Sequence, residues 1–216
     1  MPSKQKTDIE LRVKQTLKLL AKDYPDATIA LHYSNPLELL ISTILSAQCT
    51  DARVNIVTKD LFKKYRSAKD YATVDQDELE KDIHSTGFYR AKAKNIISCC
   101  KTLVEKYNGS VPSTMEELLQ LAGVGRKTAN VVLSGAFGLV EGIVVDTHVG
   151  RLAQRLGFTA ETNPEKIERD LMSITPKKDW FLIDNLLIHH GRTICDSRKP
   201  KCIECSLQEI CPSVKI

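Results

Sequence analysis

Apolar residues recur along much of this chain at intervals of three and four positions, the period of an amphipathic helix. The interval is clear from Leu11 to Leu20, from Leu37 to Leu45 and from Ile96 to Val104. Further helices are predicted over 131–137, 148–156, 164–174 and 180–189. The only strand-like run, 142–145, is too short to pair into a sheet. The pattern therefore predicts an all-α protein, and Ser113 with Glu116 predicts a capping box at one helix start.

Composition places the chain among ordinary folded proteins. Of 216 residues, 42% are hydrophobic and 27% charged, which excludes wholesale disorder. The longest uncharged apolar stretch, 129–140, is too short to cross a bilayer, and no secretory signal follows the first residues. We expect a cytoplasmic protein with no membrane partner, associated with the nucleoid in a prokaryote.

Four of the seven cysteines lie near the end of the sequence, as Cys195, Cys202, Cys205 and Cys211. Outside a secretory pathway such a cluster favours a metal over disulfides. Zinc sites usually contain two short Cys-x-x-Cys pairs, whereas one such pair with longer flanking loops favours an iron–sulfur cluster. Zinc remains the alternative. The other three cysteines, at 49, 99 and 100, fall within apolar helical patterns and are expected to be buried.

A Gly-x-Gly turn separates two predicted helices at Gly123 and Gly125. The free N–H groups at the start of the second helix form an anion site that suits a DNA phosphate. A plain packing corner between helices is the alternative. Lys127 follows in the first helical turn, where the dipole disfavours an ammonium, and a neutral lysine amine can form a Schiff base. A solvated surface lysine is the default interpretation.

Two further features carry charge. Asp146 ends an apolar run and begins a helical pattern, so it is expected to be an N-cap. A carboxylate held in that way can also stabilise a nearby cationic transition state. Arg198, Lys199 and Lys201 form a basic loop within the cysteine cluster, although the net charge of the chain is only +4.

Taken together, these motifs resemble the endonuclease III family of helix–hairpin–helix DNA glycosylases. The resemblance extends from residue 46 to residue 211 and includes the hairpin, the four cysteines and four further segments: Ser-Ala-Gln-Cys-Thr-Asp at 46–51, Gly-Phe-Tyr-Arg-Ala-Lys-Ala at 87–93, Val-Asp-Thr-His at 145–148 and Leu-Ile-His-His-Gly-Arg at 187–192.

The resemblance implies a two-domain fold and a partner. A six-helix domain would span 29–139, and residues 1–28 with 140–216 would form a discontinuous domain whose loop 195–211 holds a [4Fe–4S] cluster. Double-stranded DNA with a damaged base or an abasic site would bind in the groove between them. We expect a monomer.

The resemblance also implies a mechanism. Lys127 would attack C1′ of a flipped nucleotide, expel the oxidised pyrimidine and form a Schiff base. Asp146 would stabilise the cationic sugar, and β-elimination would then break the strand on the 3′ side of the abasic site.

Further residues are assigned to DNA contacts by the same resemblance. Gln48 would fill the space left by the flipped nucleotide, and Phe88 occupies the position where a leucine wedge is common. Without the resemblance, Phe88 is as well explained by core packing. The hairpin residues Gly123, Gly125 and Arg126 and the basic loop would contact phosphates.

Two alternatives stay open at this stage. A monofunctional mismatch glycosylase of the same superfamily generally lacks a lysine at the position of Lys127. A non-catalytic helix–hairpin–helix module stabilised by zinc would keep the glycines but would not need Lys127 together with Asp146.

Overall fold

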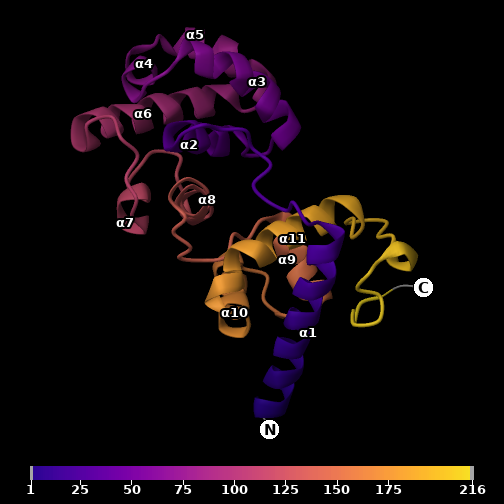
Figure 1. Cartoon of the computed structure of the whole chain (residues 1–216). Helices are drawn as coiled ribbons and strands as arrows, with labels where there is room; N and C mark the ends of the chain where they lie inside the picture. The colour runs from indigo at the N-terminus through magenta and orange to yellow at the C-terminus, as the bar shows by residue number, and fades with distance from the viewer. Residues whose placement is uncertain (1, 215–216) are drawn as a thin grey trace. The chain divides into compact units, whose positions relative to one another are not determined.

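The computed structural model describes residues 2–214, and residues 1, 215 and 216, the outer ends of the predicted discontinuous domain, lie outside the described part. The described chain is helical and contains no strand, as predicted. Its α-helices are α1 (Pro2–Asp23), α2 (Pro36–Leu45), α3 (Asp51–Lys64), α4 (Ala68–Thr73), α5 (Gln76–Ile83), α6 (Tyr89–Tyr107), α7 (Met115–Leu118), α8 (Arg126–Phe137), α9 (Thr147–Arg155), α10 (Pro164–Ile174) and α11 (Trp180–Thr193) (Figure 1). Three 3₁₀ turns complete the set, at η1 (His84–Thr86), η2 (Lys177–Asp179) and η3 (Cys202–Glu204).

Side-chain caps explain where many helices begin. Asn35, Thr50, Ser67, Asp75 and Asn163 each accept a hydrogen bond from a main-chain N–H group of the first helical turn. Such caps satisfy donors that have no partner within the helix.

The capping box predicted at Ser113 and Glu116 is wrong, because the helix start lies one residue later. Thr114 is the N-cap of α7, and its hydroxyl accepts from the N–H of Glu117. The same hydroxyl donates to the Glu117 carboxylate at 2.6 Å. Both pairs have the spacing of a capping box, and only the backbone conformation decides between them.

Two compact units make up the chain, Ala30–Glu141 and Met1–Ile29 with Gly142–Ile216. In the first unit α6 is the central helix, because it packs against α2, α4 and α5 (Figure 1). Its buried positions include Ile96, Cys99, Cys100 and Leu103, all fully inaccessible to solvent. The expectation that Cys99 and Cys100 are buried is confirmed.

Cys49 departs from the same expectation. It lies in the turn between α2 and α3 and is only partly buried. The helical pattern is interrupted there: α2 ends at Leu45, and the next helix has its N-cap five residues later, at Thr50.

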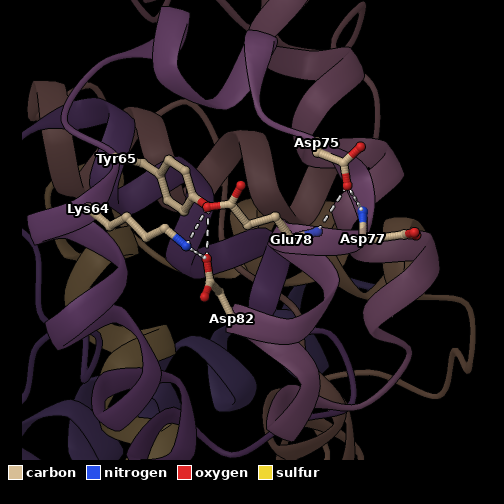
Figure 2. A network of polar contacts seen from close by, with 6 residues as sticks. All are labelled: Lys64, Tyr65, Asp75, Asp77, Glu78 and Asp82. Carbon is tan, nitrogen blue, oxygen red and sulfur yellow. Dashed lines mark hydrogen bonds and ion pairs between the residues drawn. The ribbon is translucent and has the colours of Figure 1, made fainter.

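A polar network joins α3 to α5 at the edge of this unit (Figure 2). The Lys64 ammonium lies 2.6 Å from Asp82 Oδ2 and 2.8 Å from Glu78 Oε1. The Tyr65 hydroxyl donates to the same Asp82 oxygen at 2.8 Å. Burial and the hydrogen bond to the Asp82 carboxylate raise the pKa of Tyr65 to about 12.

In the second unit α11 packs against α1 and α9, and α10 packs against α1 and α9. Its core gathers side chains from all four helices, among them Leu20, Val149, Leu171 and Leu187. Trp180 packs at the margin of this core, and its indole N–H donates to the carbonyl of Thr175.

Helix boundaries differ from the predictions mainly where apolar spacing carries no signal. Apolar spacing locates α8 only from 131, because its first turn is polar, but α8 begins at Arg126, directly after Gly125, as the Gly-x-Gly turn predicted. The helix predicted to end at His189 continues to Thr193. The run 142–145 forms no strand; it is irregular chain in which the N–H of Val144 donates to the side chain of Asp184 on α11. No helix in the described residues is long and apolar enough to cross a membrane.

Candidate functional site

The hairpin between α7 and α8 uses its two glycines for different purposes. Gly123 has φ +77°, and a Cβ there would lie 2.9 Å from the Cβ of Asn95 on α6. Its lack of a side chain is therefore needed for folding. Gly125 is the residue before α8, has an ordinary φ of −98°, and a Cβ there would meet nothing within 4 Å. The space beside Gly125 is open, and no side chain caps the helix.

Lys127 is the second residue of α8, and its side chain is exposed, as is that of Arg126. The first N–H groups of a helix have no partner within it and lie at the positive end of its dipole. Lys127 therefore stands beside a place that attracts an anion.

Asp146 is the N-cap of α9, as predicted. Its Oδ1 accepts from the N–H groups of His148 and Val149, both at 2.8 Å. The carboxylate is half-buried and held in one orientation by these bonds. Both bonds end on Oδ1, so Oδ2 is not used by the cap. Asp146 belongs to the unit of α9–α11, whereas Lys127 belongs to the unit of α2–α8.

A second carboxyl group, which no local motif marks in the sequence, supports the chain that leads to Asp146. Asp184 on α11 is only 2% exposed, and its Oδ2 accepts from the N–H of Val144 at 2.8 Å. Its Oδ1 accepts from the side-chain amide of Asn185 at 3.0 Å. Burial, opposed in part by the main-chain N–H groups of Val144 and Asn185 and reinforced by the Asp146 charge, raises the pKa of Asp184 to about 8. The available signal was a single acidic residue within the apolar pattern of 180–188.

The two residues expected to enter DNA both lie in turns with unusual backbone geometry. Gln48 has φ +52° and Phe88 has φ +47°, both in the left-handed region. Gln48 is exposed, and Phe88 is 64% exposed. The alternative that Phe88 packs in the core is therefore wrong.

The four C-terminal cysteines line one cavity of about 210 Å³ in the second unit. All four are free thiols and half-buried, and no carboxylate lines the cavity. Burial, reinforced by the neighbouring cysteines, raises the pKa of the Cys205 and Cys211 thiols. No three described histidine, cysteine, aspartate or glutamate side chains converge in a ligating geometry.

Arg155 ties the cysteine loop to α9. Its guanidinium donates to the carbonyls of Asp196 at 2.7 Å and Ser197 at 2.8 Å, and it lies 3.2 Å from Cys195 Sγ. Arg151 adds a bond to the carbonyl of Cys195 at 3.1 Å. These bonds were not anticipated, because nothing in the local sequence of α9 points to a loop 40 residues later.

The basic loop is held open to solvent. Asp196 accepts from the N–H groups of Arg198 and Lys199, at 2.8 and 3.1 Å, and these bonds lower the pKa of its carboxyl. The side chains of Arg198, Lys199 and Lys201 are all exposed. The loop thus presents three cations beside the cysteine cavity, as the sequence predicted.

An all-helical fold with a glycine hairpin, a lysine in the first turn after it and a capping aspartate is typical of helix–hairpin–helix DNA repair proteins. Residues 41–177 match the family model of the HhH-GPD superfamily base excision DNA repair proteins. Endonuclease III of Synechocystis sp. is 54% identical over 94% of this chain and 93% of the relative. Endonuclease III of Bacillus subtilis is 49% identical over 87% of this chain and 86% of the length of that relative.

Solved structures agree with these matches. A non-covalent endonuclease III–DNA complex has a TM-score of 0.90 and 49% identity, covering 94% of this chain and 95% of that one. A thermostable thymine-DNA glycosylase shares the fold with a TM-score of 0.83 at 24% identity, over 96% and 97% of the two chains. This chain belongs to the endonuclease III family. It is a DNA glycosylase and AP lyase of base excision repair, and enzymes of this family carry a [4Fe–4S] cluster.

Proposed function

We propose that this enzyme removes oxidised pyrimidines from duplex DNA through a Schiff base on Lys127 and cleaves the strand 3′ to the resulting abasic site. The observation that carries the proposal is the exposed Lys127 in the first turn of α8, directly after the open Gly125. A solved endonuclease III that is 49% identical to this chain forms a trapped covalent intermediate with DNA. The lesion class follows from family membership.

The reaction begins once the damaged nucleotide leaves the base stack, since C1′ is inaccessible within the duplex. The lone pair of the Lys127 amine forms a bond to C1′, and the bond from C1′ to the base breaks. The base leaves with that electron pair and takes up a proton. The lysine nitrogen then loses one proton. The C1′–O4′ bond breaks, O4′ takes up a proton as the sugar ring opens, and the nitrogen forms a double bond to C1′, which gives a protonated Schiff base.

Elimination follows from the Schiff base. The iminium withdraws electrons from C2′, so a proton is lost there and the C3′–O bond breaks, with the 3′ phosphate as leaving group. Water then hydrolyses the imine, releasing Lys127 and the unsaturated sugar.

Asp146 is assigned the electrostatic part of this reaction. Its carboxylate is fixed by two main-chain donors, and a fixed negative charge stabilises a cationic sugar without having to reorient. The mechanism requires Lys127 and Asp146 to act on the same nucleotide.

Duplex DNA with a damaged base or an abasic site is the proposed partner of a monomeric enzyme. Gly123, Gly125 and Arg126 would contact a phosphate at the start of α8, and Gln48 and Phe88 would enter the space left by the flipped nucleotide. The cations Arg198, Lys199 and Lys201 would bind further phosphates. We place the enzyme in the cytoplasm, at the nucleoid of a prokaryotic cell.

The chemistry of the four cysteine thiols suits a [4Fe–4S] cluster. Four thiols, with no competing carboxylate, line one half-buried cavity, and thiolates are the ligands that such clusters require. Cys195, Cys202, Cys205 and Cys211 would hold the cluster, which supplies a structural cross-link for the loop 195–211. The unit of α1 and α9–α11 would then be the iron–sulfur domain, and the unit Ala30–Glu141 the helical domain that contains the hairpin.

Borohydride trapping tests the proposal. Wild type, Lys127→Ala and the matched control Lys59→Ala, an exposed lysine of α3, are incubated with a duplex carrying one thymine glycol. Borohydride reduces a Schiff base to a stable amine, so wild type and Lys59→Ala should give a covalent adduct and Lys127→Ala none.

Alkaline heating of the same samples separates the alternatives. Strand breaks that appear only after heating, with no adduct from wild type, would show a monofunctional glycosylase. An adduct that persists in Lys127→Ala would assign the nucleophile to another residue. Neither adduct nor breaks would refute the proposed lesion class.

A further inference from the structure

Two separate turns of the unit Ala30–Glu141 each present an exposed side chain on a left-handed backbone. Gln48 follows α2, and Phe88 follows η1. This conformation costs a residue other than glycine roughly 1–2 kcal/mol, and it persists only where the surrounding structure holds it. Something in the fold must therefore hold both turns.

The group that meets both turns is the ammonium of Lys92. Its Nζ donates to the carbonyl of Leu45 at 2.8 Å and to the carbonyl of Thr86 at 2.8 Å. Leu45 is the last residue of α2 and precedes Gln48 by three positions. Thr86 is the last residue of η1 and precedes Phe88 by two. One side chain thus connects the points at which the two turns begin.

Lys92 is buried, and its main chain as well as its side chain contacts the turn of Phe88. It is only 4% exposed, on the helix α6 whose N-cap is Phe88. Its N–H donates to the carbonyl of Phe88 at 3.1 Å, so the residue holds the second turn through its main chain as well. Burial lowers the pKa of Lys92.

The acceptors also need this donor. The last carbonyls of a helix have no partner within the helix, and a buried carbonyl without a partner is costly. A buried ammonium is tolerated only when hydrogen bonds surround it. The Lys92 ammonium and the carbonyls of Leu45 and Thr86 therefore supply one another's hydrogen-bond partners. Neither helix end can move without breaking a buried hydrogen bond to the ammonium.

We infer that Lys92 is a positioning residue that fixes the turns of Gln48 and Phe88 relative to each other, so that both side chains enter the duplex together when a nucleotide is flipped. The inference rests on the proposed roles of these two residues in DNA. Lys92 touches neither substrate nor reacting atoms; it acts through the two turns. Its loss should slow base extrusion and leave the Schiff-base chemistry intact once a nucleotide is bound.

A double-mutant cycle tests this inference. Excision of thymine glycol from duplex DNA is measured under single-turnover conditions with saturating enzyme. Lys92→Met keeps the apolar stem and removes both bonds, and Lys92→Arg restores charged donors. Each is made in wild type and in the Gln48→Ala/Phe88→Ala background. Lys101→Met, an exposed lysine further along α6, is the matched control.

In the wild-type background Lys92→Met should slow excision by about ten- to a hundredfold, the effect of losing buried bonds from a charged donor. Lys92→Arg should recover most of the rate, and Lys101→Met should leave it unchanged. In the double-alanine background Lys92→Met should have almost no further effect. If Lys92→Met does not fold, as judged from its thermal midpoint, Lys92→Gln takes its place in the same cycle.

Equal slowing in both backgrounds would overturn the inference, because Lys92 would then act on the fold in general. An unchanged rate in Lys92→Met would overturn it as well. Failure of the proposed function gives a different result, since wild type itself would then yield no borohydride-trapped adduct.

Discussion

The buried carboxyl of Asp184 allows one prediction to be worked through in numbers. Asp184→Asn keeps the size of the side chain and an oxygen that can accept from the N–H of Val144. It removes the charge that wild type acquires when Asp184 loses its proton. The substitution should therefore change the pH dependence of stability and leave the fold in place.

The sign follows from the two pKa values. The pKa of Asp184 is raised from 3.8 to about 8 in the folded protein, so the folded state binds more protons than the unfolded state between these values. Stability is therefore greatest below the lower pKa and is lost as the pH rises through the higher one. Linkage at 1.36 kcal/mol per pKa unit gives a loss of about 4 kcal/mol between pH 5 and pH 9.

Thermal unfolding of wild type and Asp184→Asn across this pH range measures the effect. The difference between their midpoints removes pH effects that both proteins share, including those of the cysteine loop. The thermal midpoint of Asp184→Asn relative to that of wild type should increase steadily as the pH rises. The relative midpoint of Asp26→Asn, a change at an exposed carboxylate of the same unit, should not. Parallel curves for wild type and Asp184→Asn would refute the assignment of a buried, neutral Asp184.

Three further predictions concern the hairpin, the cap and the cysteine loop. Gly123→Ala should destabilise the protein by at least roughly 1–2 kcal/mol, because the φ of Gly123 is +77° and a Cβ would meet Asn95. Gly125→Ala should change the thermal midpoint little but weaken DNA binding, measured by fluorescence anisotropy. Asp146→Asn should keep the cap of α9, since asparagine caps as well as aspartate, yet slow single-turnover excision by about a hundredfold or more. A slower excision that is accompanied by a lower thermal midpoint would show that Asp146 acts only on the structure. Arg155→Met should lower the visible iron–sulfur absorbance per mole of protein, because the carbonyls of Asp196 and Ser197 lose their donor, whereas the exposed Arg169→Met should not; equal absorbance in both would show that the loop orders without Arg155.

The helical architecture and much of the site were predictable because they depend on local signals. Apolar spacing predicts α10 with its observed bounds and locates α2 and α6. Asp146 was recognisable as an N-cap from its place at the end of an apolar run. The spacing of the four cysteines predicted that they lie together, and all four line one cavity, whereas their role as metal ligands stays a prediction.

Other local features were ambiguous in sequence. Ser113–Glu116 and Thr114–Glu117 carry the same capping signature, and the backbone selects the second. Phe88 was equally consistent with the core and with the surface until its turn was seen to be left-handed and open.

What the sequence alone determined is therefore the class of fold and the residues with chemical potential, because helical periodicity, caps, glycine turns and cysteine spacing act over a few neighbouring positions. Only the tertiary structure decided how those residues are supported. Lys92 meets Leu45 from 47 residues away, and Asp184 meets Val144 from 40. The sequence does not reveal the partner of either residue, because folding removes the water around the lysine and the aspartate and leaves a distant main-chain group as the hydrogen-bond partner of each.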